Sequence, residues 1–282
     1  MKNRNIIIFL STTLLIALSF ILFIVIKDSN AEQLLRENPL VFEDKVFESS
    51  LKQALDKNTE ENIYNGDLVP YVGIVIASNK IFLVSPTLPE QNVVLYSGEK
   101  FEINATLYIE EGTIKSFADL KHFPNLTNLK IYFQKNADYN TLGSLPNINN
   151  LSLYANNIND LTFIESLPNI SYLSLSYNKI ENLSPLKNLT KLKTLTINNN
   201  NIKNISELET LTTLTSLQLN NNEISDISEI ANLTYLKYLS LQNNNITDVS
   251  PLENLKNLEN LFIKTNPIAN IESLNTLTII PQ

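Results

Sequence analysis

Few residues in this chain have side chains suited to catalysis. The 282 residues include one histidine, His122, and no cysteine, which excludes a metal site built on histidine and cysteine ligands. A catalytic triad needs its histidine at the end of a cleft, but His122 directly precedes an apolar residue, Phe123, in a regularly patterned segment. We therefore expect a structural role for His122, no catalytic residue and no cofactor.

The aspartates are the other candidates for chemistry. Asp160, Asp226 and Asp248 are separated by multiples of 22 residues, a regularity that could indicate calcium binding. Asparagine takes the same place in other copies of the pattern, at Asn182, Asn204 and Asn270. Because asparagine and aspartate side chains both accept hydrogen bonds in turns, we expect turn hydrogen bonding and no metal site.

The pattern that spaces these residues is a 22-residue repeat. Its template is L-x-x-L-x-L-x-x-N-x-I-x-x-I-x-x-L-x-x-L-x-x, and only Asn104 and Asn136 depart from its seven apolar positions. A fixed period of this length is the signature of a solenoid. Eight copies follow one another without insertion, starting at Asn104, Leu126, Ile148, Ile170, Leu192, Leu214, Leu236 and Leu258.

The spacing within a copy predicts its local structure. Apolar residues alternate at positions 4 and 6, which indicates a short strand with one face inward. Later apolar residues recur every three positions, as in a 3₁₀ helix. One copy buries too little surface to fold alone, so copies must stack. The position-9 asparagines should hydrogen-bond the turns together, with an irregular start at Gly112 and Gln134.

This template resembles the leucine-rich repeat of the internalin family of bacterial surface proteins. The segments Ile180–Leu189 and Ile246–Leu255 are similar to that family's consensus. The resemblance implies an α/β fold, a right-handed horseshoe-shaped solenoid with a parallel sheet on the concave face, 3₁₀ and loop returns on the convex face, and a helical N-terminal cap. It also implies a protein partner, although this repeat binds many unrelated partners.

Residues 1–31 have the pattern of a membrane anchor or a signal peptide. Lys2 and Arg4 precede the apolar segment Ile6–Ile26, which is long enough to cross a bilayer as a helix. The positive N-terminal flank predicts that the rest of the chain is extracytoplasmic. We favour an uncleaved anchor in the cell membrane. The alternative is secretion after cleavage near Ala31.

Residues 32–103 are expected to form the cap and a small β insertion. Asp44 is a candidate N-cap for a helix, and Phe42 should pack on its first turn. Two segments rich in β-forming residues follow, Val72–Ala77 and Lys80–Ser85, and Ser78-Asn79 between them suits a tight hairpin turn. A third such segment lies at Asn92–Tyr96.

Residues 104–282 form the repeat domain. The last copy has no successor, so we expect apolar side chains on its edge to be exposed, and either the final residues or a second molecule to cover them. Oligomerisation through this repeat is the second option. The apolar residues concerned are Leu261, Ile263, Ile271 and Leu274.

The strand pattern also predicts a binding surface. If positions 4 and 6 face the core, positions 3, 5 and 7 face the concave side and position 8 lies at its rim. Exposed aromatic residues on one face are typical of binding hot spots, although tyrosine is also an ordinary strand residue. The candidate partner-binding residues are Tyr108, Tyr132, Phe133, Tyr154, Tyr172, Tyr177, Tyr238 and Phe262.

Charge and composition limit the partner. The chain has 21 Lys and Arg against 29 Asp and Glu, and binding to nucleic acid requires a basic face. The candidate face is rich in aromatic and amide side chains, which suits a protein or peptide, with a glycan as the alternative ligand. The main hypothesis is a surface-exposed protein that binds another protein. The alternative is a membrane-anchored scaffold or regulatory subunit for an envelope protein of the same cell.

Overall fold

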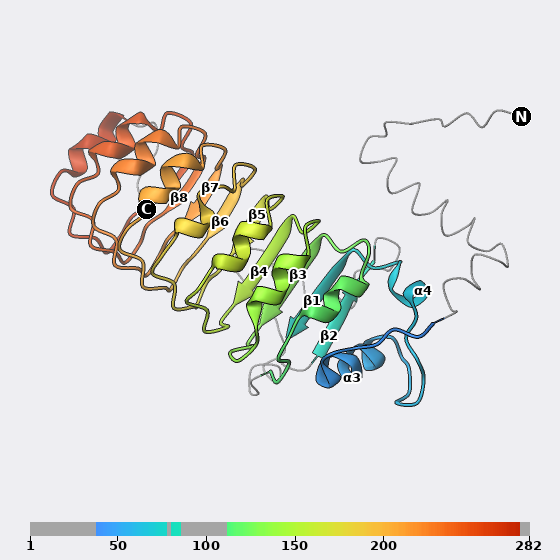
Figure 1. The fold of residues 1–282 in the computed structure, drawn as a ribbon. Helices are drawn as coiled ribbons and strands as arrows, with labels where there is room; N and C mark the ends of the chain where they lie inside the picture. The colour runs from blue at the N-terminus through green and yellow to red at the C-terminus, as the bar shows by residue number, and fades with distance from the viewer. Residues whose placement is uncertain (1–37, 78–79, 86–111, 277–282) are drawn as a thin grey trace, which may run out of the picture.

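The fold is a curved stack of repeats built on one nine-stranded sheet (Figure 1). The computed structural model describes residues 38–77, 80–85 and 112–276. The strand order is β2-β1-β3-β4-β5-β6-β7-β8-β9, and every pair is parallel except β1 with β2. The strands are β1 (Gly73–Ala77), β2 (Lys80–Val84), β3 (Asn128–Tyr132), β4 (Asn150–Tyr154), β5 (Tyr172–Ser174), β6 (Thr194–Thr196), β7 (Ser216–Gln218), β8 (Tyr238–Ser240) and β9 (Asn260–Phe262).

A row of 3₁₀ helices lies on one side of this sheet (Figure 1), and the core fills the space between the two layers. In the fourth copy, for example, Leu173, Leu175 and Ile180 are fully buried. The predicted leucine-rich-repeat solenoid with 3₁₀ returns is confirmed. The returns are η3 (Ala118–His122), η4 (Tyr139–Ser144), η5 (Thr162–Ser166), η6 (Ser184–Leu186), η7 (Ser206–Thr210), η8 (Ser228–Asn232), η9 (Ser250–Asn254) and η10 (Ile271–Thr276).

The position-9 asparagines form a buried hydrogen-bonded column. Asn178 donates from Nδ2 to Leu153 O at 2.8 Å in the preceding copy and to Leu175 O at 2.9 Å in its own. Its Oδ1 accepts from the backbone N–H of Asn156 and of Ile158, both at 3.0 Å. Strand partners are lacking at this turn, so the amide satisfies buried backbone groups of two copies at once.

The column begins irregularly, as predicted. The Gln134 backbone N–H donates to Asn156 Oδ1 at 2.8 Å, and the Gln134 side chain is fully buried. A Cβ added at Gly112 would lie 1.8 Å from Gln134 Nε2. The missing side chain at position 112 is therefore what leaves room for a glutamine in the place of the usual asparagine.

Two aspartates attach the N-terminal cap to the first return. Helix α3 (Lys45–Ala54) begins at the predicted N-cap, Asp44, whose Oδ1 accepts from Val46 N and Phe47 N. Its Oδ2 accepts from Lys115 N at 2.6 Å. The buried carboxylate of Asp119 in η3 accepts in return from the backbone N–H of Asp44 at 2.8 Å. The repeat pattern does not mark Asp119, so its role was not predicted.

The aromatic contacts of the cap also follow the prediction. The Phe42 ring packs on Phe47 in the first turn of α3, with centroids 6.3 Å apart. His122 is half-buried against this cap. Its ring lies 5.2 Å from that of Phe42, and its Nε2 is 3.2 Å from Val41 O. A structural role for His122 accounts for these contacts. The short helix α4 (Asn65–Leu68) follows and leads into β1.

The hairpin of β1 and β2 forms as predicted but is not a separate insertion. Ala77 pairs with Lys80 in the antiparallel register, and β1 pairs in parallel with β3. Strand β1 thereby occupies the place beside β3 where the first copy's own strand, around Tyr108, was expected. Residues 86–111 lie outside the described residues, as does the predicted strand Asn92–Tyr96, so the domain boundary at 104 stays a prediction.

Most of the apolar edge predicted in the last copy is covered. Leu261, Ile263 and Leu274 are buried, and only Ile271 is exposed. Leu261 and Ile263 point inward from β9 and its end, and η10 turns Leu274 toward the core. Residues 277–282, which were predicted to cover this edge, lie outside the described residues, so cover by the final residues and oligomerisation through this repeat both stay predictions.

No helix in the described part of the chain is long and apolar enough to cross a membrane. The anchor or signal segment predicted at residues 1–31 lies outside the described residues.

Candidate binding site on the sheet

The candidate site lies on the side of the sheet that faces away from the 3₁₀ helices. We call this side the sheet face and define it by positions 3, 5 and 7 of each copy. Leu129 and Ile131 of β3 are fully buried, so Lys130 between them points the opposite way, because side chains alternate along a strand. This is the surface that the repeat pattern predicted to be concave.

Three aromatic rings meet at the N-terminal part of this face, one from position 7 and two from the position-8 rim. The Tyr154 ring lies 5.9 Å from Phe133 and 4.9 Å from Tyr177, measured between centroids. Tyr177 is 52% exposed, and Phe133 and Tyr154 are half-buried. Ala155, between Phe133 and Tyr177 in the position-8 column, is small enough to leave this space to the rings. We call these three residues, Phe133, Tyr154 and Tyr177, the aromatic cluster.

Tyr132 does not offer its ring to a partner. It retains only 4% of its exposure and belongs to a small second core with Val75 and Ala77, against which Phe82 and Phe133 pack. The cause is the position of β1 beside β3, which pairs Ala77 with Tyr132. The predicted contact role of Tyr132 is replaced by a packing role.

The remaining predicted residues lie apart from the aromatic cluster. Tyr172 is half-buried at the start of β5, and Tyr238 pairs with Phe262 near the C-terminal end, with ring centroids 5.3 Å apart. Tyr108 lies outside the described residues. Among the described residues the predicted aromatic set therefore divides into two groups, with amide and hydroxyl side chains between them.

The rim of the sheet face has an unusual backbone. The position-8 residue of seven successive copies has a positive φ, between 55° and 62°. Asparagine tolerates this left-handed conformation, whereas bulky side chains seldom adopt it. Copies five to seven have Asn199, Asn221 and Asn243 there, but Phe133 and Tyr177 have the same φ, 61°. This conformation was not predicted from the sequence, although the recurring asparagine at position 8 was a signal for it.

The amides of the middle and later copies are partly used within the protein. Asn198 Oδ1 accepts from Asn220 N at 2.8 Å, and Asn220 Oδ1 accepts from Gln242 N at 2.8 Å and from Ser240 Oγ at 2.7 Å. A second column of hydrogen bonds thus runs along position 7. These amides hold the strands together, which leaves them less available to a ligand than the sequence suggested.

The recurring aspartates act in turns, as predicted. Asp160, Asp226 and Asp248 each accept from the backbone N–H two residues later at 2.9–3.0 Å. The hydrogen bonds from Ser228 and from Ser250 lower the pKa of Asp226 and of Asp248 respectively. In the part of the chain that the structure describes, no three His, Cys, Asp or Glu side chains are grouped so that they could hold a metal ion.

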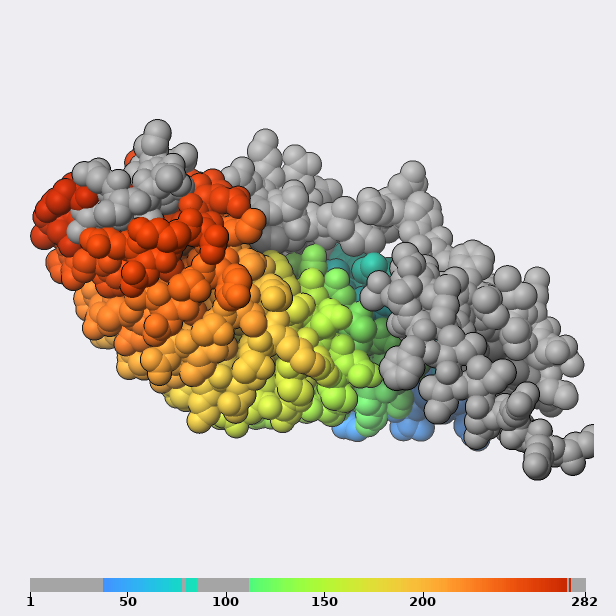
Figure 2. All heavy atoms as spheres, turned by 90° about the horizontal axis from the view of Figure 1, so that it is seen from above, coloured from blue at the N-terminus to red at the C-terminus, as the bar shows by residue number. Residues whose placement is uncertain are grey.

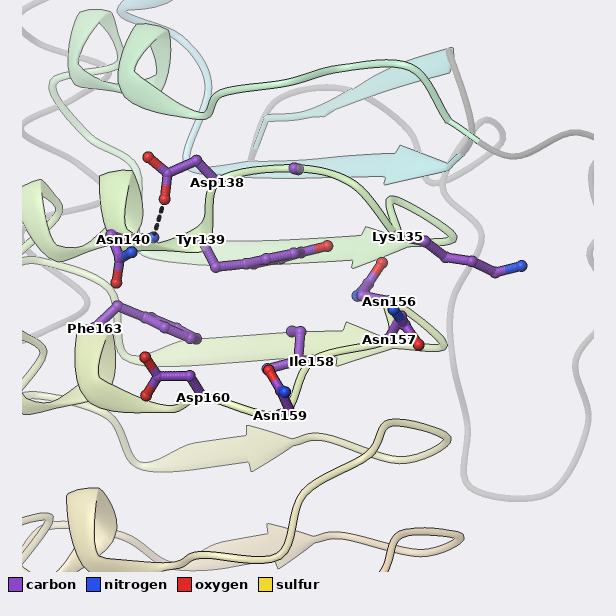
Figure 3. Close-up of a pocket in the computed structure, with 11 residues that line it drawn as sticks. Lys135, Asp138, Tyr139, Asn140, Asn156, Asn157, Ile158, Asn159, Asp160 and Phe163 are labelled. Carbon is purple, nitrogen blue, oxygen red and sulfur yellow. Dashed lines mark hydrogen bonds between the residues drawn. The ribbon is translucent and has the colours of Figure 1, made fainter.

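A cavity of about 300 Å³ opens between the second and third copies, away from the sheet face (Figure 3). It lies where Asn136 breaks the repeat pattern, since Ile158 has the equivalent position in the next copy. The Tyr139 ring extends into this region, lies 6.1 Å from Phe163 and donates from its hydroxyl to Gln134 O at 2.7 Å. Burial raises the pKa of Tyr139. The Tyr139 ring, which is larger than an isoleucine side chain, compensates for the isoleucine that is missing at position 136.

Comparison with known proteins agrees with this geometry. Residues 190–232 and 234–276 each match the family model described as "Leucine Rich repeats (2 copies)". Internalin C2 of Listeria monocytogenes is 29% identical over 80% of this chain and 94% of its own, with a TM-score of 0.56. This chain is an internalin-like leucine-rich-repeat protein. A leucine-rich-repeat protein of Leptospira interrogans is 28% identical over 60% of this chain and 46% of its own, with a TM-score of 0.54. A search of curated proteins finds no match.

An internalin-like leucine-rich-repeat fold is one that serves protein–protein interaction. The match to internalin C2 includes almost the whole of that chain. The aromatic cluster is a feature of this chain's own sheet face.

Proposed function

We propose that this internalin-like protein is exposed outside the cytoplasm and binds a partner protein or peptide on its sheet face. In this proposal the aromatic cluster is the centre of the site, and Tyr172, Tyr238 and Phe262 contribute at its periphery. The N-terminal segment 1–31 anchors the chain in the membrane, or directs its secretion if it is cleaved near Ala31.

The observation that carries the proposal is the exposed ring of Tyr177 in a left-handed backbone conformation. Asparagine occupies the same position in three later copies and would be the favoured residue for the backbone. Residues held in unfavoured conformations cluster at functional sites, and an outlier of this kind supports a hypothesis of function. Tyrosine is also enriched among the residues that dominate binding energy.

The test uses Tyr177→Asn, which removes the ring and suits the backbone. Partner candidates are isolated by passing host-cell and native envelope extracts over the immobilised full-length protein. We expect at least a tenfold loss of affinity for the isolated partner, since a hot-spot residue contributes more than about 1.4 kcal/mol. Tyr235→Asn is the matched control, because Tyr235 is 65% exposed at position 22 of its copy, off the sheet face.

Unchanged affinity in Tyr177→Asn and in Tyr154→Ala would show that the site lies elsewhere. The source of the partner decides between the two biological roles. A stoichiometric partner from the native envelope supports a scaffold or regulatory subunit, and a partner from another cell supports adhesion.

A further inference from the structure

A second chemical feature adjoins the aromatic cluster at the N-terminal part of the sheet face. Lys130 lies at the centre of β3, with Val75 of β1 on one side and Ser152 of β4 on the other. Ser174 follows in the same column on β5. Neighbouring strands are about 4.8 Å apart, so the small Ser152 side chain lies directly beside the long cationic side chain of Lys130, and Ser174 lies one strand further along.

The polar groups of these side chains have no partners within the described residues. Lys130 makes no ion pair or side-chain hydrogen bond there, whereas Lys121 and Lys237 lie within 2.9 Å of a glutamate oxygen. Partial burial lowers the pKa of Lys130. The hydroxyls of Ser152 and Ser174 make no side-chain hydrogen bond to the described residues, although both residues are more than nine-tenths buried. The side-chain oxygen of Asn150 is buried and also lacks a partner in the same part of the chain.

Strands β7 and β8 of the same face differ in this respect. There the Ser240 hydroxyl donates to Asn220 Oδ1 at 2.7 Å, and Asn198 Nδ2 donates to Gln218 Oε1 at 3.3 Å. The repeat can thus satisfy polar groups at these positions internally. A polar group that loses water without gaining a partner destabilises the fold, and the Asn150 oxygen is such a group. Together with the unpartnered ammonium and hydroxyls beside it on β3, β4 and β5, it points to a ligand that supplies the partners.

We propose that Lys130, with the hydroxyls of Ser152 and Ser174, binds a carboxylate of the protein partner, carried by an aspartate, a glutamate or the chain terminus. This inference rests on the proposed function, because it names the chemistry that the partner presents beside the aromatic cluster. A single ammonium matches the charge of one carboxylate, and a charge-assisted hydrogen bond is stronger than a neutral one. The partner segment therefore combines an acidic residue with an apolar or aromatic one.

The test is a selection from a random peptide library displayed on phage, performed on the full-length protein. Three proteins are compared: wild type, Lys130→Met, which keeps the length of the buried stem, and Lys264→Met, which removes another cation at position 7 of the last copy. We expect wild type and Lys264→Met to enrich peptides that contain Asp or Glu near an apolar residue. Lys130→Met should enrich the apolar residue alone. For a selected peptide, Glu→Gln should weaken binding to wild type about tenfold and leave binding to Lys130→Met unchanged.

Two results would overturn the inference while leaving the proposed function intact. One is enrichment of apolar peptides by wild type without any acidic residue, lost in Tyr177→Asn. The other is equal enrichment of acidic peptides by wild type and Lys130→Met. If the selected peptides bind Tyr177→Asn, Tyr154→Ala and Lys130→Met as they bind wild type, the inference and the proposed function both fail. Binding to an array of acidic glycans, with no peptide selected, would contradict the choice of a protein ligand.

Discussion

At the scale of single residues, position 8 shows how the repeat and its function make different demands. The backbone there is left-handed in seven copies. The conformation costs an ordinary L-residue roughly 1–2 kcal/mol, and asparagine less. Tyr177 therefore carries backbone strain, but it supplies a ring whose centroid lies 4.9 Å from that of Tyr154.

Comparing two substitutions at Tyr177 should separate these effects. Both Tyr177→Ala and Tyr177→Asn lose the ring contact, but only asparagine relieves the backbone. We expect Tyr177→Asn to exceed Tyr177→Ala by about 0.5–1 kcal/mol in the free energy of unfolding, measured by urea denaturation. Asn199→Ala, with a φ of 57°, is the control and should lose a similar amount. Equal stability of the two Tyr177 variants would contradict the claim that the backbone is strained at this position.

Lys130 should make stability depend on pH in the alkaline range. Burial lowers its pKa in the folded protein below the ordinary lysine value of about 10.5, so between the two values the unfolded chain binds more protons. The contribution of Lys130 to the free energy of unfolding must then rise with pH across this window. Between pH 8.5 and 10.5 we expect the free energy of unfolding to increase less in Lys130→Met than in wild type. Urea denaturation of both proteins at each pH measures this. Identical slopes would show that the folded protein does not shift this pKa.

At the scale of elements, the asparagine column is what joins one return to the next. Each buried amide serves backbone groups of two copies, as Asn200 does by accepting from Ile180 N at 3.0 Å and donating to Leu175 O at 3.1 Å. The strand pairs alone leave these groups without partners. The column is therefore as much a part of the architecture as the sheet.

Asn200→Ala should be strongly destabilising for this reason. It leaves a buried donor and buried acceptors unsatisfied, at a cost of about 2–4 kcal/mol in the free energy of unfolding. Asn201→Ala is the control. Asn201 is exposed and adjacent in sequence, and its substitution should change stability by less than about 0.5 kcal/mol. Urea denaturation of both variants gives the comparison, and similar midpoints would mean that the column contributes little.

Much of this architecture could be predicted from the sequence because burial requires apolar residues at fixed positions of the repeat. Leu173, Leu175 and Ile180 are apolar since each faces the core of its copy, and the turn chemistry of Asp226 is local. The position of β1 in the sheet could not be predicted, because Gly73–Ala77 lacks the repeat pattern and its pairing with β3 is a long-range contact.

The candidate site was harder to predict than the fold. Which aromatic residues belong to the site depends on the position of β1. Tyr132 is buried because Ala77 and Val75 lie beside it, and no pattern around Tyr132 indicates this. The lack of partners at Lys130 among the residues that the structure describes likewise follows from which of their side chains surround it.

At the scale of the whole molecule, the repeats form a continuous curved body (Figure 2) in which strands and returns contact mainly their neighbours. Such arrays have stabilities close to a sum over copies and their junctions. The cap satisfies the first return through Asp44 and Asp119, so the N-terminal end is closed by specific hydrogen bonds as well as by apolar packing.

The identical junctions between copies have a consequence for the distance between the two aromatic groups. Deleting residues 192–213 removes one complete copy and lets Asn178 meet Asn222 as it now meets Asn200. The shortened protein should fold with nearly the same cooperativity, as monitored by circular dichroism during thermal unfolding. Tyr177 and Tyr238 should move closer by one strand spacing, about 4.8 Å. A partner that contacts both aromatic groups would then bind less tightly, whereas the affinity of a partner that contacts Tyr177 alone would not change. The copy number of the array thus sets the length of the partner segment that can reach both ends.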